Sequence, residues 1–308
     1  MFSTSSNKKI GLIDSGIGGL SVYQSLAETL PHFSYIYLAD YAYHPYGTLS
    51  EEDLSSRVIS LGQNFVKKFS LDILVIACNT ASTITLQKLR NKLSIPVIGV
   101  VPAIKPAAEN SKSGLIGLLA TKATSKNPYT KNLIEKYAPN CQVISVGSHL
   151  LVQWAEAKIW TQNDPPQHNQ GSLPPSLAIV KRELQDILLH EEVDMIVLGC
   201  THFPFIKEEL QSFFSVGVQL LDSGAAIAKR LQEMTGHLPR QTPKKTKTLA
   251  VFTANPNPNI NFTDLEKRLK ERFHIEELKL WQGEIENKTA KHLPTLHSFN
   301  PTNASKIL

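Results

Sequence analysis

The sequence has no long hydrophobic run. None of its 308 residues lies in a stretch that approaches the roughly 18 consecutive apolar residues of a membrane-spanning helix. The first residues, MFSTSSNKKIGLIDSG, contain no apolar segment long enough for a signal peptide. Cysteine is scarce too, and three is an odd number, which argues against a disulfide framework and fits a reducing compartment. We therefore expect a cytoplasmic protein with no membrane partner.

Signatures of metal, nucleotide and cofactor binding are missing as well. The sequence contains no C-x-x-C or H-E-x-x-H motif, and Cys200 and His202 are too close in sequence for a usual zinc pair. It has no P-loop, and Ser21 stands where a dinucleotide fingerprint starting at Gly16 needs its third glycine. We therefore predict no metal and no cofactor.

Positive charge gives no sign of a nucleic-acid partner. The net charge is +5, and four basic residues cluster in the segment RQTPKKTK (240–247). Aromatic side chains, which stack on bases in many nucleic-acid sites, do not interleave with that cluster. We interpret the segment as a solvated linker and expect no nucleic-acid partner.

What the sequence does contain is a repeated alternation of short apolar runs and amphipathic segments. The segments from Leu54 to Phe69 and from Leu177 to Leu189 have apolar residues at three- and four-residue spacing, which is typical of helices. The apolar runs predict strands at residues 8–14, 34–40, 72–78, 95–100, 114–120, 142–147, 194–200 and 218–222. This alternation predicts an α/β fold in which helices cover both faces of mostly parallel sheets.

The two halves of this pattern resemble each other. The run IGLIDSG is repeated 106 positions later as IGLLATK, and DILVIACNT (72–80) is repeated as DMIVLGCTH (194–202). A looser pair consists of IPVIGVVPAI and VQLLDSGAAI. Three pairs in the same order predict two related, pseudo-symmetric α/β domains. They do not predict a stacked repeat protein, because two units are too few to stack.

Polar and reactive residues follow the predicted strands, where ligand sites of open α/β sheets lie. They are Asp14, Ser15, Asp40, Cys78, Asn79, Thr80, Thr121, Cys200, Thr201 and His202. The turn DSGIGGLS also follows a strand, and its free backbone N–H groups at a helix start suit a small anion such as a carboxylate. A plain structural turn is the alternative.

Two of the three cysteines occupy matching positions in the two halves. A lone cysteine at a strand end is usually a buried hydrophobic residue, but Cys78 and Cys200 would reach one cleft from opposite sides if the domains face each other. Two thiols flanking a small molecule suit a reaction that removes a proton from one face of a carbon and returns it to the other. Helix N-termini should lower the pKa of both thiols. Cys141 lies at the wrong end of its strand and is predicted to be structural.

The neighbours of these cysteines leave other interpretations open. His202 could relay a proton to Cys200, and Asp14 could do the same for Cys78. Asn79, Thr80 and Thr201 could bind a substrate carboxylate or simply cap the following helices. A Cys-His hydrolase that uses Cys200 is one rival hypothesis, and a non-catalytic amino-acid-binding domain is another.

Five segments together resemble the glutamate racemases of the aspartate/glutamate racemase family. They are GLIDSGIGGLSV, PYGTLS, VIACNTAST, GLLATKAT and LGCTHFPFI, and the resemblance covers roughly residues 8–235. It implies a cofactor-independent, two-base racemase that interconverts L- and D-glutamate and supplies D-glutamate for peptidoglycan. Related aspartate racemases share the paired cysteines, so racemisation of another amino acid is the alternative.

The resemblance also implies roles for individual residues. Cys78 and Cys200 would be the proton donors and acceptors, with Asp14 and His202 as their assistants. The substrate-binding positions would be Asp14, Ser15, Tyr46, Gly47, Asn79, Thr80, Thr201 and His202, with Thr121 as a lesser candidate. Glu156 aligns with a family acid near the site, although Gln153 and Trp154 depart from the family pattern, and His44 lies just before the PYGTLS motif.

A domain division and an assembly follow from the same resemblance. Residues 1–100 and 216–286 would form the first domain, residues 101–215 the second, and residues 287–308 a polar tail. After Gly236 the alternation weakens, and only a helix-like segment from Phe262 to Phe273 stands out. The family also leads us to expect a homodimer with glutamate as its small-molecule partner.

Overall fold

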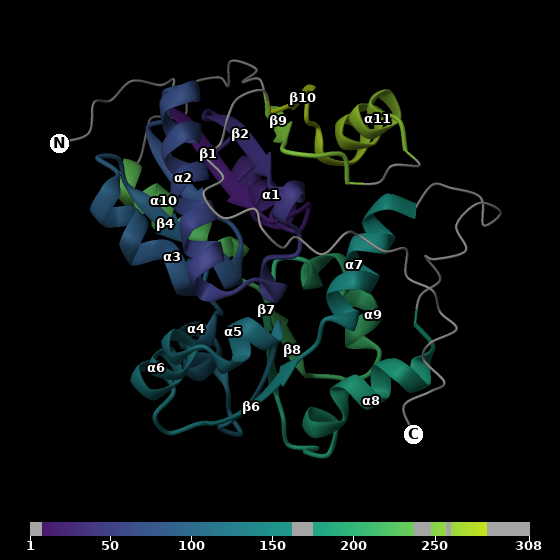
Figure 1. The fold of residues 1–308 in the computed structure, drawn as a ribbon. Coiled ribbons are helices and arrows are strands. Elements are labelled where there is room, and N and C mark those ends of the chain that lie inside the picture. The colour runs from purple at the N-terminus through teal and green to yellow at the C-terminus, as the bar shows by residue number, and fades with distance from the viewer. Residues whose placement is uncertain (1–7, 162–174, 237–247, 257–259, 282–308) are drawn as a thin grey trace.

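The computed structural model describes residues 8–161, 175–236, 248–256 and 260–281. Within these residues the strands form two sheets, one of six strands and one of four, and every strand pair is parallel. Figure 1 shows the six-stranded sheet in the upper part of the molecule and the four-stranded sheet in the lower part. The predicted α/β class is confirmed.

The six-stranded sheet has the order β10-β9-β2-β1-β3-β4. Its strands are β1 (Lys9–Asp14), β2 (Ser34–Ala39), β3 (Ile73–Ile76), β4 (Val97–Gly99), β9 (Leu249–Phe252) and β10 (Glu277–Leu280). One face packs on α1 (Leu20–Thr29), α10 (Gly224–Thr235) and α11 (Phe262–Phe273). The other face packs on α2 (Glu51–Phe69) and α3 (Asn79–Lys92). The central strands are therefore buried on both sides, which explains their continuous apolar sequences.

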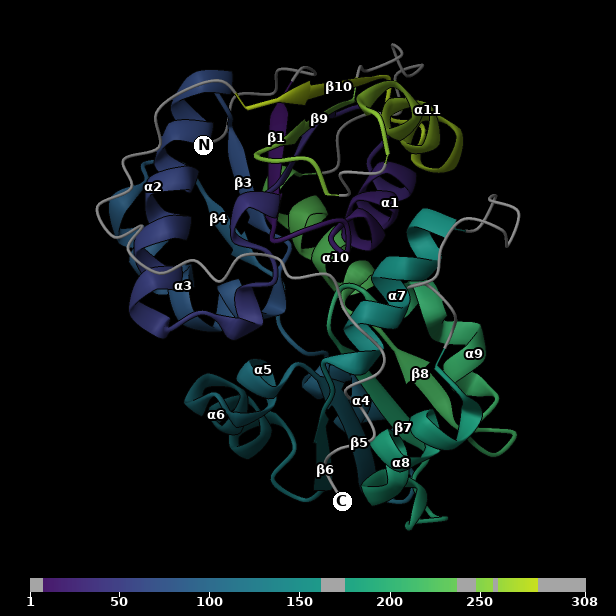
Figure 2. The same cartoon turned by 45° about the vertical axis from the view of Figure 1, so that its right-hand side comes forward.

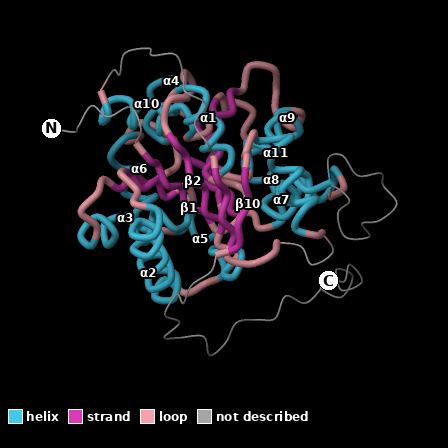
Figure 3. The backbone as a smooth tube through the Cα atoms, turned by 90° about the horizontal axis from the view of Figure 1, so that it is seen from above, coloured by secondary structure: helices cyan, strands magenta, loops and turns pink. Residues whose placement is uncertain are grey.

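The four-stranded sheet has the order β6-β5-β7-β8. Its strands are β5 (Leu115–Ala120), β6 (Gln142–Gly147), β7 (Met195–Gly199) and β8 (Gln219–Leu221). The helices of this half are α4 (Ile104–Asn110), α5 (Lys122–Lys126), α6 (Pro128–Tyr137), α7 (Leu150–Thr161), α8 (Leu177–Leu188) and α9 (Lys207–Gln211). Short 3₁₀ helices η1 (Tyr41–Tyr43), η2 (Tyr46–Thr48) and η3 (Phe203–Ile206) complete the described elements. Figure 3 shows the strands in the interior with helices around them.

The predicted internal repeat is confirmed by the strand order. The order β2-β1-β3-β4 in the first sheet corresponds to β6-β5-β7-β8 in the second. Each of the three predicted sequence pairs therefore falls on a pair of equivalent strands: β1 with β5, β3 with β7, and β4 with β8. The cysteines after β3 and β7 are consequently equivalent positions in the two sheets.

The predicted boundary at residue 216 differs from the sheet topology. Residues 219–221 form β8, which pairs with β7 in the second sheet. The chain returns to the first half only after this strand, where α10 packs against the core of the six-stranded sheet. The strand itself was predicted, at residues 218–222, but the domain division implied by the family resemblance assigned it to the first half.

The sequence did not predict β9 and β10. These two strands extend the first sheet beyond β2, although the helix predicted between them at Phe262–Phe273 is confirmed. Strand β10 lies at the sheet edge and buries only Leu278 of its four residues, so its sequence carries little apolar signal. The predicted basic linker at 240–247 and the predicted polar tail at 287–308 lie outside the described residues.

Helix α7 connects the two halves of the molecule. Its first turns place Leu151, Val152 and Ala155 in the core of the four-stranded sheet. Its last turn places Ile159 and Trp160 in the core of the six-stranded sheet, and Arg272 of α11 donates a hydrogen bond to the Ile159 carbonyl at 2.9 Å. Figure 2 shows α7 lying between the two lobes. The two ends of α7 are therefore packed in different cores, and the middle of the helix lies between them.

Candidate active site

A cavity of about 160 Å³ lies between the two sheets at the ends of their strands. It receives residues that follow β1, β3, β5 and β7, so both halves contribute to it. Its lining consists of Asp14, Ser15, His44, Pro45, Tyr46, Gly47, Thr48, Cys78, Asn79, Thr80, Thr121, Lys122, His149, Val152, Cys200, Thr201 and His202. Every predicted catalytic and substrate-binding residue therefore lines one cavity. No described group of three or more His, Cys, Asp or Glu side chains could hold a metal ion.

The two cysteines reach this cavity from equivalent positions. Cys78 follows β3 and is the N-cap residue of α3, while Cys200 follows β7 and precedes η3. Both are buried and both are free thiols. The expectation of a helix start at each sulfur is therefore confirmed for Cys78, whereas Cys200 is followed by a turn and a short 3₁₀ helix.

The environment of Cys78 overturns one prediction. The sequence predicted that the helix N-terminus would lower the pKa of this thiol, and backbone N–H groups of Ala81 and Thr80 do act in that direction. Burial raises the pKa of Cys78 more strongly, and the negative charge of Asp14 raises it further. Cys78 therefore holds its proton at neutral pH.

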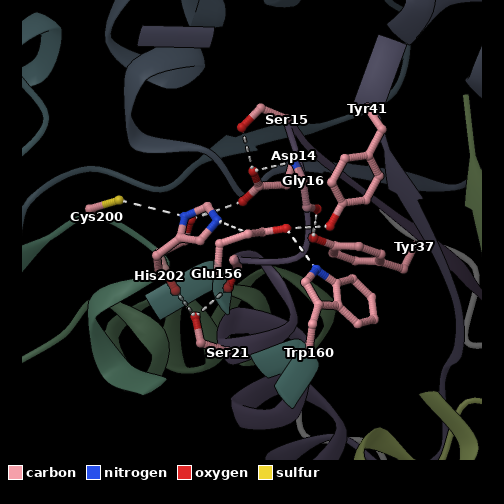
Figure 4. A network of polar contacts seen from close by, with 12 residues as sticks. Asp14, Ser15, Gly16, Ser21, Tyr37, Tyr41, Glu156, Trp160, Cys200 and His202 are labelled. Carbon is pink, nitrogen blue, oxygen red and sulfur yellow. Dashed lines mark hydrogen bonds and ion pairs between the residues drawn. The ribbon is translucent and has the colours of Figure 1, made fainter. Parts of the chain in front are cut away.

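Cys200 belongs to a chain of polar contacts that leads into α7. Its Sγ lies 3.7 Å from Nδ1 of His202, and Nε2 of His202 lies 2.7 Å from Oε2 of Glu156. Figure 4 shows the imidazole between the sulfur and the carboxylate. Glu156 Oε1 accepts hydrogen bonds from Tyr41 at 2.6 Å and from Trp160 at 3.1 Å. Glu156 is thus a half-buried residue behind His202 that does not itself line the cavity, a position that its family alignment left undecided.

The charges of His202 and Glu156 stabilise each other. Burial alone would lower the pKa of His202, but hydrogen bonds to Cys200 and Glu156 raise it well above its ordinary value. Burial likewise disfavours the Glu156 carboxylate, yet the hydrogen bond and charge of His202 lower the pKa of Glu156 to about 2. At neutral pH the site therefore contains an imidazolium–carboxylate pair next to the sulfur of Cys200.

Asp14 is fully buried and links the two halves of the cavity. Its Oδ1 accepts hydrogen bonds from Ser15 Oγ at 3.1 Å and from the Gly16 N–H at 3.2 Å. Its Oδ2 accepts one from Thr201 Oγ1 at 2.9 Å. Because Asp14 occupies the Gly16 N–H, that group of the glycine-rich turn is not free for a substrate anion.

The predicted capping roles of Asn79 and Thr80 are not observed. Helix α3 has no side-chain cap at its N-terminus, and Asn79 Oδ1 is buried without a hydrogen-bond partner in the described structure. Thr80 Oγ1 instead contacts the hydroxyl groups of Thr121 and Thr124 at 3.0 and 3.2 Å. Thr121 does cap its helix, because its side chain accepts a hydrogen bond from the Thr124 N–H. An unpaired amide oxygen at the cavity wall is available to a ligand.

Asp40 is the strand-end residue that does not line the cavity. It accepts two hydrogen bonds from Arg57, at 2.8 and 2.6 Å, one from Tyr46 at 2.8 Å and one from Thr253 at 2.8 Å. This buried network holds Tyr46 against the cavity, so Asp40 acts on the site through its neighbours.

Gly18 allows His202 to approach the turn after β1. A methyl group on its Cα would lie 2.6 Å from Cε1 and 2.8 Å from Cγ of His202, closer than atoms in contact can lie. The imidazole ring of His202 cannot move away, because its Nδ1 contacts Cys200 and its Nε2 contacts Glu156. We expect Gly18→Ala to lower the free energy of unfolding by about 1–3 kcal/mol, as overpacked cores do, and to reduce kcat.

Urea unfolding and steady-state kinetics would check this expectation. Gly62→Ala is the control, because its methyl group would meet only the ends of flexible side chains, those of Leu89, Leu74 and Ile13, at 3.1, 3.6 and 3.9 Å. A Gly18→Ala variant with the stability and kcat of the unmodified protein would show that His202 is not held as described.

The chain was next compared with known proteins. The family described as Asp/Glu/hydantoin racemase matches residues 10–231, which include all the residues placed at the cavity so far. The chain belongs to this racemase family.

Similar members include the glutamate racemases of Vibrio cholerae and Klebsiella pneumoniae. The first is 48% identical over 236 residues, which is 76% of this chain and 83% of that protein. The second is 45% identical over 226 residues, or 73% of this chain and 76% of that protein. The crystal structure of Escherichia coli glutamate racemase has 38% identity and a TM-score of 0.75, with coverage of 89% of this chain and 98% of that one.

The racemase therefore has the activity of these relatives, isomerisation of glutamate, and the family implies a role in peptidoglycan synthesis. The isomerisation of glutamate, which was predicted from the five sequence motifs, is confirmed. No helix among the described residues is long and apolar enough to cross a membrane.

Several cavity residues of the racemase were not singled out by the sequence. Thr48, Lys122, His149 and Val152 line the cavity. Thr48 lies within the segment PYGTLS, and Lys122 ends the repeated segment IGLLATK directly after the candidate Thr121, so these two positions did carry a sequence signal. His44 does line the cavity, and its buried Nδ1 has no hydrogen-bond partner in the described structure.

Proposed function

We propose that this chain racemises glutamate with two thiols, Cys78 and Cys200, each serving one face of the α-carbon. The observation that supports the proposal is the position of the two free cysteines. They follow equivalent strands of two pseudo-symmetric sheets and line one cavity of small-molecule size. A bound amino acid between them would present opposite faces to the two sulfurs.

Glutamate as the substrate is supported by the relatives. The E. coli enzyme was crystallised with L-glutamate and the Francisella tularensis enzyme with D-glutamate. Related enzymes thus bind both enantiomers, as a reversible racemase requires. Whether this chain forms the homodimer expected from its family stays a prediction.

The proposed reaction has two proton transfers. The thiolate of one cysteine takes the α-proton, the C–H bond breaks, and its electron pair spreads onto the α-carboxylate. The thiol of the other cysteine then gives its proton to the opposite face of the carbon and becomes a thiolate. The first cysteine then loses its proton to water and the second takes one up from water, which restores the starting protonation.

The two sulfurs have different surroundings. Cys78 keeps its proton, because burial and Asp14 raise its pKa, and it is suited to be the donor. Cys200 lies 3.7 Å from the ring of His202, whose raised pKa keeps a positive charge beside this sulfur. An α-hydrogen that faces Cys200 is therefore removed first by Cys200, and the reverse reaction uses the same groups in the opposite order.

The difficult step is formation of a carbanion-like state, because an α-proton is far less acidic than a thiol. Preorganised hydrogen-bond donors around the α-carboxylate stabilise such a state in a site that excludes water. Ser15, Asn79 and Thr80 line the cavity, the last two directly after Cys78 in the sequence, and we assign the α-carboxylate to them. Asp14 is the acid available to the α-ammonium group.

The experiment that tests this function is racemisation of L-glutamate in D₂O without added cofactor. We expect the circular dichroism signal to decay to zero and D-glutamate to carry deuterium at the α-carbon. Early in the reaction the remaining L-glutamate should still carry hydrogen, because the base that removes the proton is not the one that returns it. Product that retains the original hydrogen would contradict two separate bases.

A further inference from the structure

Helix α11 lies beyond residues 10–231, which the racemase family matches, yet it contacts both segments that carry the Glu156–His202 pair. Glu156 belongs to α7, and His202 directly precedes η3. Figures 1 and 2 both show α11 beside the upper end of α7. The reaction described above assigns no role to this helix.

Two arginines of α11 bind the C-terminal end of α7. The last four backbone carbonyls of a helix have no partner within the helix, and those of Ile159 and Trp160 belong to this group in α7. Arg272 Nη1 donates a hydrogen bond to the Ile159 carbonyl at 2.9 Å, and Arg268 Nη1 donates one to the Trp160 carbonyl. Positive charge is favourable here, because the C-terminal end of a helix dipole is negative. The end of α7 is thus capped by a distant part of the chain.

This end of α7 leads directly to Glu156. Trp160 lies one turn after Glu156, and its indole N–H donates to Glu156 Oε1 at 3.1 Å. The other oxygen of the same carboxylate lies 2.7 Å from Nε2 of His202. A displacement of the last turn of α7 would therefore move the indole, and with it the carboxylate that balances the charge of His202.

Arg272 also contacts the segment that carries His202. Its guanidinium carbon lies 5.7 Å from the centre of the Phe205 ring, within the range of a cation–π interaction. The Phe205 ring packs edge-on against Phe273 of α11, with 5.9 Å between the ring centres. The Phe205 N–H donates to the His202 carbonyl at 3.1 Å. One arginine therefore touches the chain on both sides of the Glu156–His202 contact.

We propose that Arg272 and Arg268 are positioning residues for racemisation, which hold the end of α7 so that Glu156 keeps its contact with His202. The inference rests on the proposed function, because that function uses the positive charge of His202 beside Cys200. Neither arginine lines the cavity, so both act through the Glu156–His202 pair and not on the substrate.

The test replaces Arg272 with methionine, which keeps an apolar stem against Phe205 but has neither the charge nor the donor. We expect kcat to fall about 5- to 10-fold, less than the loss of about 10- to 100-fold expected for Glu156 itself. KM should stay within about twofold, because Arg272 does not line the cavity. Arg272→Lys keeps a charged donor and should recover kcat to within about threefold of the unmodified enzyme. Lys267→Met is the matched control, because Lys267 is an exposed lysine of the same helix that pairs with Glu271.

A double-mutant cycle with Glu156→Gln separates positioning from a general loss of structure. If Arg272 acts through Glu156, adding Arg272→Met to Glu156→Gln should lower kcat by less than about twofold further. The rates are measured below the temperature at which circular dichroism shows any variant to unfold. If Arg272→Met does not fold, Arg268→Met, which loses the hydrogen bond to Trp160, replaces it in the cycle. An equal loss in both backgrounds, or an equal loss in Lys267→Met, would overturn the proposal.

This proposal and the two-thiol reaction fail in distinguishable ways. If product formed in D₂O retained its original hydrogen, the two-thiol reaction would fail. The cycle would still show whether Arg272 and Glu156 are coupled, because it uses only the rate of racemisation. Independent losses in the cycle would instead overturn the role of α11 and leave the two-thiol reaction unaffected.

Discussion

Replacing Cys78 or Cys200 with alanine is expected to reduce kcat by about 10³-fold or more in both directions of racemisation, since general acid–base groups contribute about 10²–10⁴-fold each. Either direction needs one thiolate to remove a proton and one thiol to return it, so the remaining cysteine cannot complete turnover. Polarimetry or circular dichroism of L- and D-glutamate would measure the loss.

The third cysteine provides the control for this experiment. Cys141 is half-buried, packs in the core of the four-stranded sheet and does not line the cavity, so Cys141→Ala should leave kcat within about twofold. Calorimetric binding of glutamate by the two inactive variants would show that they remain folded. A Cys78→Ala enzyme that racemises glutamate at the normal rate would contradict the two-thiol reaction.

The second large effect is expected from Glu156→Gln, which should lower kcat by about 10- to 100-fold. Glutamine can still accept the hydrogen bonds from Tyr41 and Trp160, but its uncharged amide cannot balance an imidazolium at Nε2 of His202. The pKa of His202 should fall, because burial already acts in that direction and the opposing carboxylate is gone. The sulfur of Cys200 would then lose the positive charge beside it.

The pH dependence of kcat tests this explanation. In the unmodified enzyme the pKa of His202 lies well above its usual 6.5, so its imidazolium persists through neutral pH. In Glu156→Gln, kcat should decrease as pH rises through the lowered pKa of His202. Glu135→Gln removes a carboxylate from an exposed surface pair with Lys131 and should change neither kcat nor its pH profile. Parallel profiles for the Glu156→Gln and unmodified enzymes would contradict the role given to Glu156.

The same pair predicts how stability changes with pH. The lowered pKa of Glu156 contributes stability above about pH 4.5, its unfolded value, and the contribution is lost as pH falls toward 2. The raised pKa of His202 contributes stability below pH 6.5, its unfolded value, which is lost as pH rises through the folded pKa. Unfolding free energy should therefore differ most between the unmodified enzyme and Glu156→Gln from about pH 4.5 to about pH 6.5. We expect a difference of about 2–4 kcal/mol in this range.

The sequence alone predicted the α/β class, the repeat and the paired cysteines. Strand periodicity and strand-end position are local properties, and the eight predicted strands from residues 8 to 222 all occur with small differences at their ends. The repeat added one non-local inference, because two similar halves that face each other must bring equivalent residues such as Cys78 and Cys200 to the same cleft.

Contacts between distant segments could be decided only by the tertiary structure. Glu156 meets His202 across 46 positions, and Thr201 meets Asp14 across 187, through packing of α7 and of the two sheets that no sequence period specifies. The same holds for the direction of the Cys78 pKa, because a helix N-terminus can be recognised in a sequence but burial and a buried neighbouring charge cannot. Lys122 and His149 likewise come together only because β6 lies beside β5. The sequence thus determined which reactive groups meet at the cavity, and folding decided their charges and partners, because burial and distance exist only after the chain has packed.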